Sequence, residues 1–71
     1  MNAMASERKR LGMSQDDLAR ELNRNRSTII RWESDPSVMN GETLMTLATL
    51  FGCSVDYLLG RTDDRLTRQA G

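Results

Sequence analysis

The segment Arg24–Glu33, RNRSTIIRWE, holds most of the side chains in this chain that could do chemistry. It contains three arginines, a serine and the only tryptophan. A guanidinium group keeps its charge at any ordinary pH and presents several N–H donors in a rigid fork. These residues therefore indicate recognition of an anion or of a planar hydrogen-bond acceptor.

The composition argues against catalysis and against a metal site. The chain has no histidine, which is the commonest general base, and one cysteine, Cys53. Histidine and cysteine are also the usual zinc ligands, so we expect no metal, no cofactor and no enzymatic activity. No small-molecule ligand is evident either. A single cysteine excludes an internal disulfide framework and fits a reducing cytoplasm.

The length of 71 residues predicts one small domain. A chain of this size buries only about 60% of the surface that its unfolded form exposes. No apolar run approaches the ~20 residues that cross a membrane. The first ten residues, MNAMASERKR, lack the apolar stretch of a signal peptide, so we expect a cytoplasmic protein.

The net charge is zero, but the charges are unevenly distributed. Residues 1–34 hold seven basic and five acidic side chains, whereas residues 35–64 hold one basic and five acidic side chains. The N-terminal half is therefore the part that could face an anion.

Five short helices and no strand are expected. The first spans about residues 2–11, and the other four follow polar N-cap candidates, which are Ser14, Asn25, Asn40 and Ser54. They end ahead of residues that close or break helices, which are Asn23, Pro36, Gly52 and Gly60. Residues 34–40 are expected to form a loop. Only about two residues separate the second and third helices, which is typical of a helix-turn-helix.

The third helix is expected to have two different faces. With about 100° per residue and Arg26 at 0°, Ile30 falls at about 40° and Arg31 at about 140°. Ile29 and Trp32 fall at about 300° and 240°, so they form the face that packs on the core. The opposite arc has two interpretations. It is either an ordinary solvated face or a surface on which arginines pair with guanine and Ile30 contacts a thymine methyl.

Two blocks of sequence resemble the Cro/cI-type (XRE) helix-turn-helix family, which includes the N-terminal domains of lambdoid phage repressors. They are RLGMSQDDLARELNRNRSTIIRWE and NGETLMTLATLFGCSVDYLLG, and the resemblance runs from about residue 4 to residue 60. It implies an all-α, five-helix, lambda-repressor-like domain over residues 1–60, with a polar tail or linker over residues 61–71. It also implies double-stranded DNA as the partner, with the third helix in the major groove.

The resemblance also implies roles for individual residues. Base contacts are expected from Arg26, Ser27 and Arg31, with Ile30 as a further candidate. Phosphate contacts are expected from residues at the helix starts, which are Gln15, Asn25, Asn40 and Gly41. Arg24 is a further candidate that does not come from the family pattern. Gln15 is further expected to brace Arg26. A buried ion pair is expected between Arg8 and Glu33.

The turn before the third helix and Glu7 depart from the family pattern. Arg24 follows Asn23 where relatives carry an apolar residue after glycine, so Arg24 either reaches a phosphate or loosens the turn. Glu7 occupies a position that is often apolar, so the first helix is expected to pack thinly. Met45 and Leu50 flank the apolar stripe of the fourth helix, either as peripheral core or as part of a partner surface.

The resemblance favours a transcriptional regulator, most simply a repressor that binds a palindromic operator as a homodimer. Val55 and Tyr57 are the candidate dimer contacts. The alternative is a protein-interaction module on the same fold, such as an antitoxin or anti-repressor subunit. That module would bind its partner through Leu50, Tyr57 and the tail.

Overall fold

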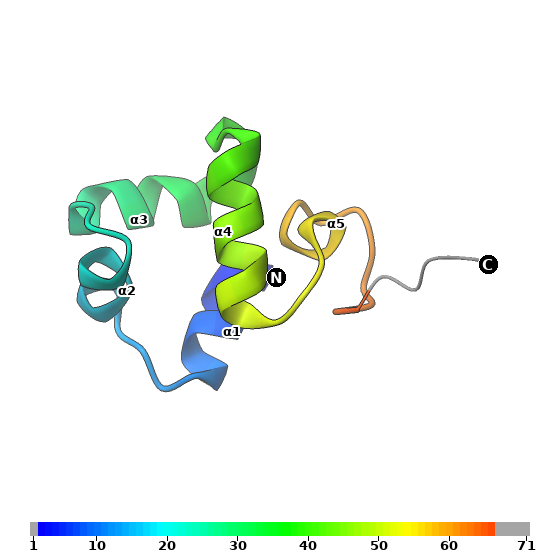
Figure 1. Cartoon of the computed structure of the whole chain (residues 1–71), viewed down its shortest axis with the longest axis horizontal. Helices are drawn as coiled ribbons and strands as arrows, with labels where there is room; N and C mark the ends of the chain where they lie inside the picture. Colours follow the sequence, from blue (N-terminus) through cyan, green and yellow to red (C-terminus); the bar gives the residue numbers. More distant parts are fainter. Residues whose placement is uncertain (1, 67–71) are drawn as a thin grey trace.

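The computed structural model describes residues 2–66; residue 1 and residues 67–71 lie outside that range. The regular secondary structure of the described part is helical, and it includes no strand. Five α-helices follow one another with short connections (Figure 1), and they are α1 (Ala3–Arg10), α2 (Gln15–Glu21), α3 (Arg26–Ser34), α4 (Gly41–Phe51) and α5 (Val55–Leu58). In Figure 1, α2 and α3 lie at one end of the long axis and α5 lies toward the other.

Side-chain caps fix where most of these helices begin. The Ser14 side chain accepts a hydrogen bond from the Asp17 N–H, and the Asp17 carboxylate accepts one from the Ser14 N–H, which forms a capping box. The Asn40 side chain caps α4 in a similar way by accepting from the Thr43 N–H at 2.8 Å. Asn25 corrects our expectation: it occupies the N-cap position of α3, but its side chain makes no capping hydrogen bond.

The α2–α3 connection closes through Asn23, whose φ of 56° is the left-handed conformation expected for it. Beyond α3, the segment expected to be a loop contains one turn of 3-10 helix, η1 (Pro36–Val38). The Asp35 carboxylate organises this turn by accepting from both the N–H and the hydroxyl of Ser37. The turn was not predicted because such a short helix has no periodicity to read.

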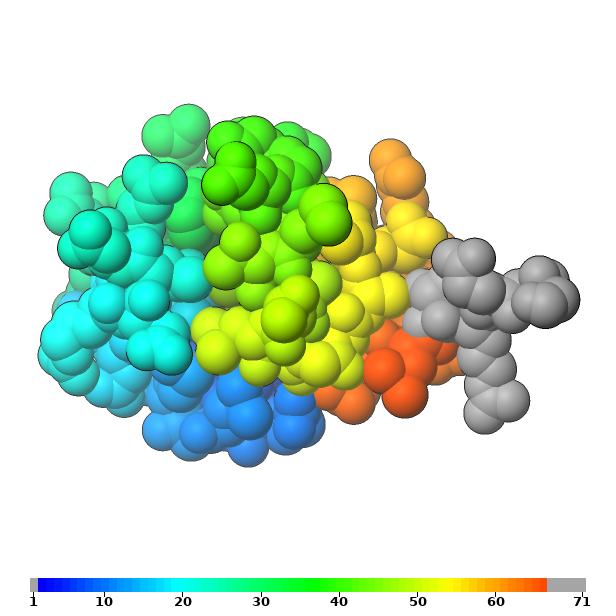
Figure 2. Space-filling model, in the orientation of Figure 1, coloured from blue at the N-terminus to red at the C-terminus, as the bar shows by residue number. Residues whose placement is uncertain are grey.

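The core is one cluster of side chains from all five helices. Its fully buried members are Met4, Leu18, Ile29, Leu47, Phe51 and Leu58. The helix α4 contributes most to the core, because its apolar residues at the i, i+3, i+4, i+7 spacing are all buried. They are Leu44, Leu47, Ala48 and Phe51. The outer surface of α4 faces the viewer in Figure 2. Met45 is 67% exposed, so the peripheral-core interpretation was wrong for it, whereas Leu50 packs partly against the core.

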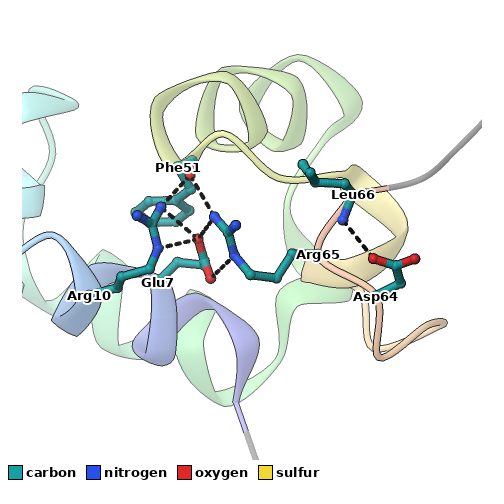
Figure 3. Close-up of polar contacts among 6 residues, drawn as sticks. All are labelled: Glu7, Arg10, Phe51, Asp64, Arg65 and Leu66. Atoms are coloured by element: carbon teal, nitrogen blue, oxygen red, sulfur yellow. Dashed lines mark hydrogen bonds and ion pairs between the residues drawn. The ribbon is translucent and has the colours of Figure 1, made fainter.

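Glu7 is a charged residue, yet it is buried, with 2% of the residue exposed. Arg10 and Arg65 both donate to it, and both also donate to the backbone carbonyl of Phe51 (Figure 3). The pKa of Glu7 lies below its ordinary value, chiefly because of the hydrogen bonds from Arg65. Burial opposes this by raising the pKa, and the hydrogen bonds from Arg10 lower it further. We call these four residues the Glu7 cluster.

The Glu7 cluster holds residues 61–66 against the helices. The Arg65 guanidinium donates to Glu7 at 2.7 and 2.6 Å, and the Ser54 N–H donates to the Arg65 carbonyl at 2.7 Å. These bonds join a segment expected to be a polar tail or linker to α1 and to the start of α5. The remainder of that segment, residues 67–71, lies outside the described residues.

Candidate nucleic-acid interface

The helix α3 has one buried face and one exposed face. Ile29 is fully buried and Trp32 is 8% exposed. The four residues expected to contact bases are all exposed, and they are Arg26, Ser27, Ile30 and Arg31. Ile30 is 43% exposed, which is a large exposure for an isoleucine. The exposed face therefore combines guanidinium donors with one accessible apolar side chain.

An ion pair holds α3 against α1. The Arg8 Nε donates to a Glu33 carboxylate oxygen at 2.7 Å, and both side chains are about nine-tenths buried. The Arg8 guanidinium also donates to the Met13 carbonyl at 2.9 Å, ahead of α2. These are the two residues for which a buried ion pair was expected. They fix the orientation of α3, and hence of its exposed face.

Gln15 has a different partner from the one expected. Its side-chain amide donates to the Glu33 carboxylate at 3.1 Å instead of bracing Arg26. The reason is that Glu33, which Arg8 already holds beside α2, is a charged acceptor within reach. The acid that lies near Arg26 is Asp16, whose Oδ1 is 4.0 Å from the Arg26 Nε.

Arg24 packs on an aromatic ring. Its guanidinium carbon lies 5.8 Å from the centre of the Trp32 ring, within the range of a cation–π interaction. The Arg24 N–H donates to the Ala19 carbonyl at 2.8 Å and closes the turn after α2. Arg24 thus covers Trp32 at the place where relatives carry an apolar residue. The side chain remains exposed, so its charge is accessible to solvent.

The starts of α3 and α4 hold the other expected phosphate contacts. Asn25 is exposed and its side chain makes no capping bond, so its amide is available to a ligand. Asn40 and Gly41 are also exposed, although the side-chain Oδ1 of Asn40 already caps α4. Glu42 follows in the first turn of α4 and is exposed, which places a negative charge beside these donors.

The start of α2 is the most firmly capped of these helix starts. The hydrogen bond that the Ser14 N–H donates to its carboxylate holds the pKa of Asp17 below its ordinary value, and the Ser14 side chain and the charge of Arg20 act in the same direction. Asp17 is therefore charged at neutral pH and committed to the cap. This commitment keeps the first turn of α2, including Gln15, in a fixed conformation.

The candidate dimer contacts belong to α5. Val55 and Tyr57 are both partly buried within one chain, and Val55 packs against the core. Among residues 2–66, no cluster of side chains could hold a metal ion. None of the described helices has both the length and the apolar character to cross a bilayer.

Two short helices joined by a tight turn, the second with an exposed basic face, define a helix-turn-helix domain. A family model described as helix-turn-helix, HTH_3, matches residues 4–58, so the chain belongs to this Cro/cI-type family. Neither a search of curated proteins nor a search of solved structures gave a match. Membership of the family implies DNA binding in the service of transcriptional regulation, without catalytic activity.

Proposed function

We propose that this protein is a transcriptional repressor that binds a palindromic operator as a homodimer in the cytoplasm. In this proposal α3 lies in the major groove of double-stranded DNA, and bound protein excludes RNA polymerase from the promoter. The observation that carries the proposal is the division of α3. Its buried face is anchored by Ile29 and Trp32, and its exposed face presents two arginines and an isoleucine.

The exposed face suits direct reading of bases. Arg26 and Arg31 are five residues, or about 1.4 turns, apart, so each guanidinium can meet a different base pair. An arginine fork pairs bidentately with the N7 and O6 acceptors of guanine, and an apolar side chain contacts the thymine methyl group. Arg26 and Arg31 are thus the proposed guanine contacts, Ile30 the thymine contact and Ser27 a further base contact.

Phosphate contacts in this proposal come from residues beside α3. Gln15, Arg24, Asn25, Asn40 and Gly41 are the candidates, and the last two offer the backbone N–H groups of a helix start. With a net charge of zero and Glu42 among these residues, few phosphates are neutralised. Affinity should therefore fall with salt less steeply than for a strongly basic protein and should depend more on base contacts.

A homodimer is proposed because one such domain offers only ~600–1,000 Å² of interface with DNA. Two copies on a palindrome would place their α3 helices ~34 Å apart, one turn of DNA. Val55 and Tyr57 are the proposed contacts between the copies. Because Val55 already packs on its own core, a contact there would use only the exposed part of its side chain.

Selection of bound duplexes from a random pool tests this function. The wild type is expected to enrich a two-fold symmetric motif that contains guanines. Arg26→Ala and Arg31→Ala should each lose one of these guanines. Arg61→Ala, which removes an exposed arginine that follows α5 and pairs with Asp56, should leave the motif unchanged. Absence of enrichment at every salt concentration would refute the function and favour a protein-interaction module.

A further inference from the structure

We propose that Asp16 is a specificity-determining residue, which positions the guanidinium of Arg26 for base reading. The inference rests on the proposed function, since it concerns which base Arg26 selects. It begins from a contact that the family pattern did not indicate. The Asp16 carboxylate in the first turn of α2 lies 4.0 Å from the Nε of Arg26, and both side chains are about 60% exposed.

Asp16 is the residue able to do this because its neighbour is engaged elsewhere. The Gln15 amide donates to Glu33, which Arg8 holds in place. Together with Arg26, Asp16 borders a shallow hollow at the start of α2. The base-reading arginine therefore has an acidic neighbour rather than an amide neighbour.

The negative charge of Asp16 offsets an unfavourable position of the Arg26 charge. Arg26 is the first residue of α3, where the helix dipole is positive and a cation is unfavourable. The first turn of α3 contains no acid that would offset this. Asp16 supplies the missing negative charge from α2. Because its closest approach is to Nε, the two terminal nitrogens of Arg26 stay available for a bidentate pair.

The same charge has an opposite effect on overall affinity. In the proposed complex the start of α2 faces the DNA backbone, and a carboxylate there repels phosphate. Asp16 is thus expected to weaken binding to all sequences while it restricts Arg26 to the orientation that reads guanine. Such a residue favours discrimination between sequences over affinity.

Because both side chains are exposed, Asp16 can be replaced without destabilising the fold. An exposed ion pair contributes little to stability, so Asp16→Asn is expected to fold as the wild type does. Glu21→Gln is the matched control. It removes one negative charge from an exposed position on the same helix, and no ion pair to Glu21 is found within residues 2–66. Asp16→Glu keeps the charge and should retain most of the effect.

The first measurement uses the free protein. The NMR signal of the Arg26 Nε–Hε group is expected to shift in Asp16→Asn but not in Glu21→Gln. The second measures the affinity for the selected duplex and for one in which the guanine assigned to Arg26 is replaced by adenine. Asp16→Asn is expected to lower that ratio of affinities about fivefold, and to bind unrelated duplex more tightly.

A double-mutant cycle tests whether Asp16 acts on base preference through Arg26. In an Arg26→Ala background, Asp16→Asn should no longer change the base preference at this position. The inference is overturned if the ratio is unchanged by Asp16→Asn, or if the change persists without Arg26. A wild type that selects no duplex would refute the proposed function and the specificity role together, while the NMR result would still decide whether the ion pair exists.

Discussion

Glu7→Gln is expected to destabilise the domain, because the Glu7 cluster depends on a full negative charge. The side chain of Glu7 is 3% exposed and accepts four hydrogen bonds of 2.6–3.1 Å from Arg10 and Arg65. A glutamine keeps one acceptor oxygen but directs an NH₂ donor at a guanidinium donor. The substitution therefore removes charge-assisted bonds and creates one repulsive contact.

The exposure of Arg10 and Arg65 determines how much stability Glu7→Gln should lose. Breaking a buried ion pair costs about 3–5 kcal/mol when the surviving charge stays buried. Here Arg10 and Arg65 are 45% and 37% exposed, so water can solvate them after the change. We expect a loss of about 1–2 kcal/mol, at the level of one or two charged hydrogen bonds. For a domain of this size that loss lowers Tm by roughly 4–16 °C.

The loss should also depend on pH in a defined direction. The pKa of Glu7 is lowered on folding, with hydrogen bonds from Arg65 as the largest cause. Its stabilising effect is therefore fully present above the ordinary pKa of 4.5 and is lost as the pH falls through the folded value. The difference between wild type and Glu7→Gln should be constant at about pH 6–8 and should shrink below 4.5.

Urea unfolding at several pH values is the assay, with Glu21→Gln as the control for the same chemical change at an exposed site. The control should lie within about 0.5 kcal/mol of the wild type. The reasoning would be refuted if Glu7→Gln cost no more than Glu21→Gln. A cost that did not change down to about pH 3 would refute the electrostatic part of it.

Four further substitutions have defined outcomes. Glu33→Gln should cost about 3 kcal/mol in urea unfolding, because it leaves a nearly buried arginine without its counter-charge; a loss below about 1 kcal/mol would contradict this. Gly52→Ala should lower thermal stability by about 1 kcal/mol, because Gly52 has a φ of 69°, whereas Gly41→Ala in the first turn of α4 should raise it by about 0.5 kcal/mol. Equal signs would refute the backbone argument. Arg24→Ala should shift the fluorescence of Trp32 and cost about 0.5 kcal/mol, and an unchanged spectrum would exclude the cation–π contact.

Features set by neighbouring residues were predictable from the sequence. Ser14 and Asn40 mark helix starts because a cap needs only a side-chain oxygen and an N–H three residues later. The burial of Ile29 and Trp32, with Ser27 and Arg31 on the opposite face, follows from a helical turn of 100° per residue. The pair between Arg8 and Glu33 joins distant segments, and it was expected only from the family resemblance.

Contacts chosen by the tertiary fold were not predictable in this way. Glu7 and Arg65 are 58 residues apart, and nothing local to either one indicates the other. The sequence showed only that Glu7 was unusual at its position. Which arginine would neutralise Glu7 depended on where α5 and the following residues lie relative to α1.

The exposed face of α3 was predictable from the sequence, but the contacts that support it were not. Gln15 was expected to brace Arg26, but the position of Glu33 offered its amide a charged acceptor instead. Asp16 lies near Arg26 only because the turn between α2 and α3 sets the helices at this distance. The distance between Asp16 and Arg26 could not be predicted from the sequence, because it depends on how both helices pack on the core.

The claim that α3 reads guanine in the major groove has a direct test. In the duplex selected by the wild type, each guanine assigned to Arg26 or Arg31 is replaced by 7-deazaguanine, which lacks the N7 acceptor but still pairs with cytosine. The wild type is expected to bind the substituted duplex at least about fivefold more weakly. Arg26→Ala should be insensitive to the replacement at the guanine assigned to Arg26. Equal wild-type affinity for the normal and substituted duplexes would contradict recognition of guanine by α3.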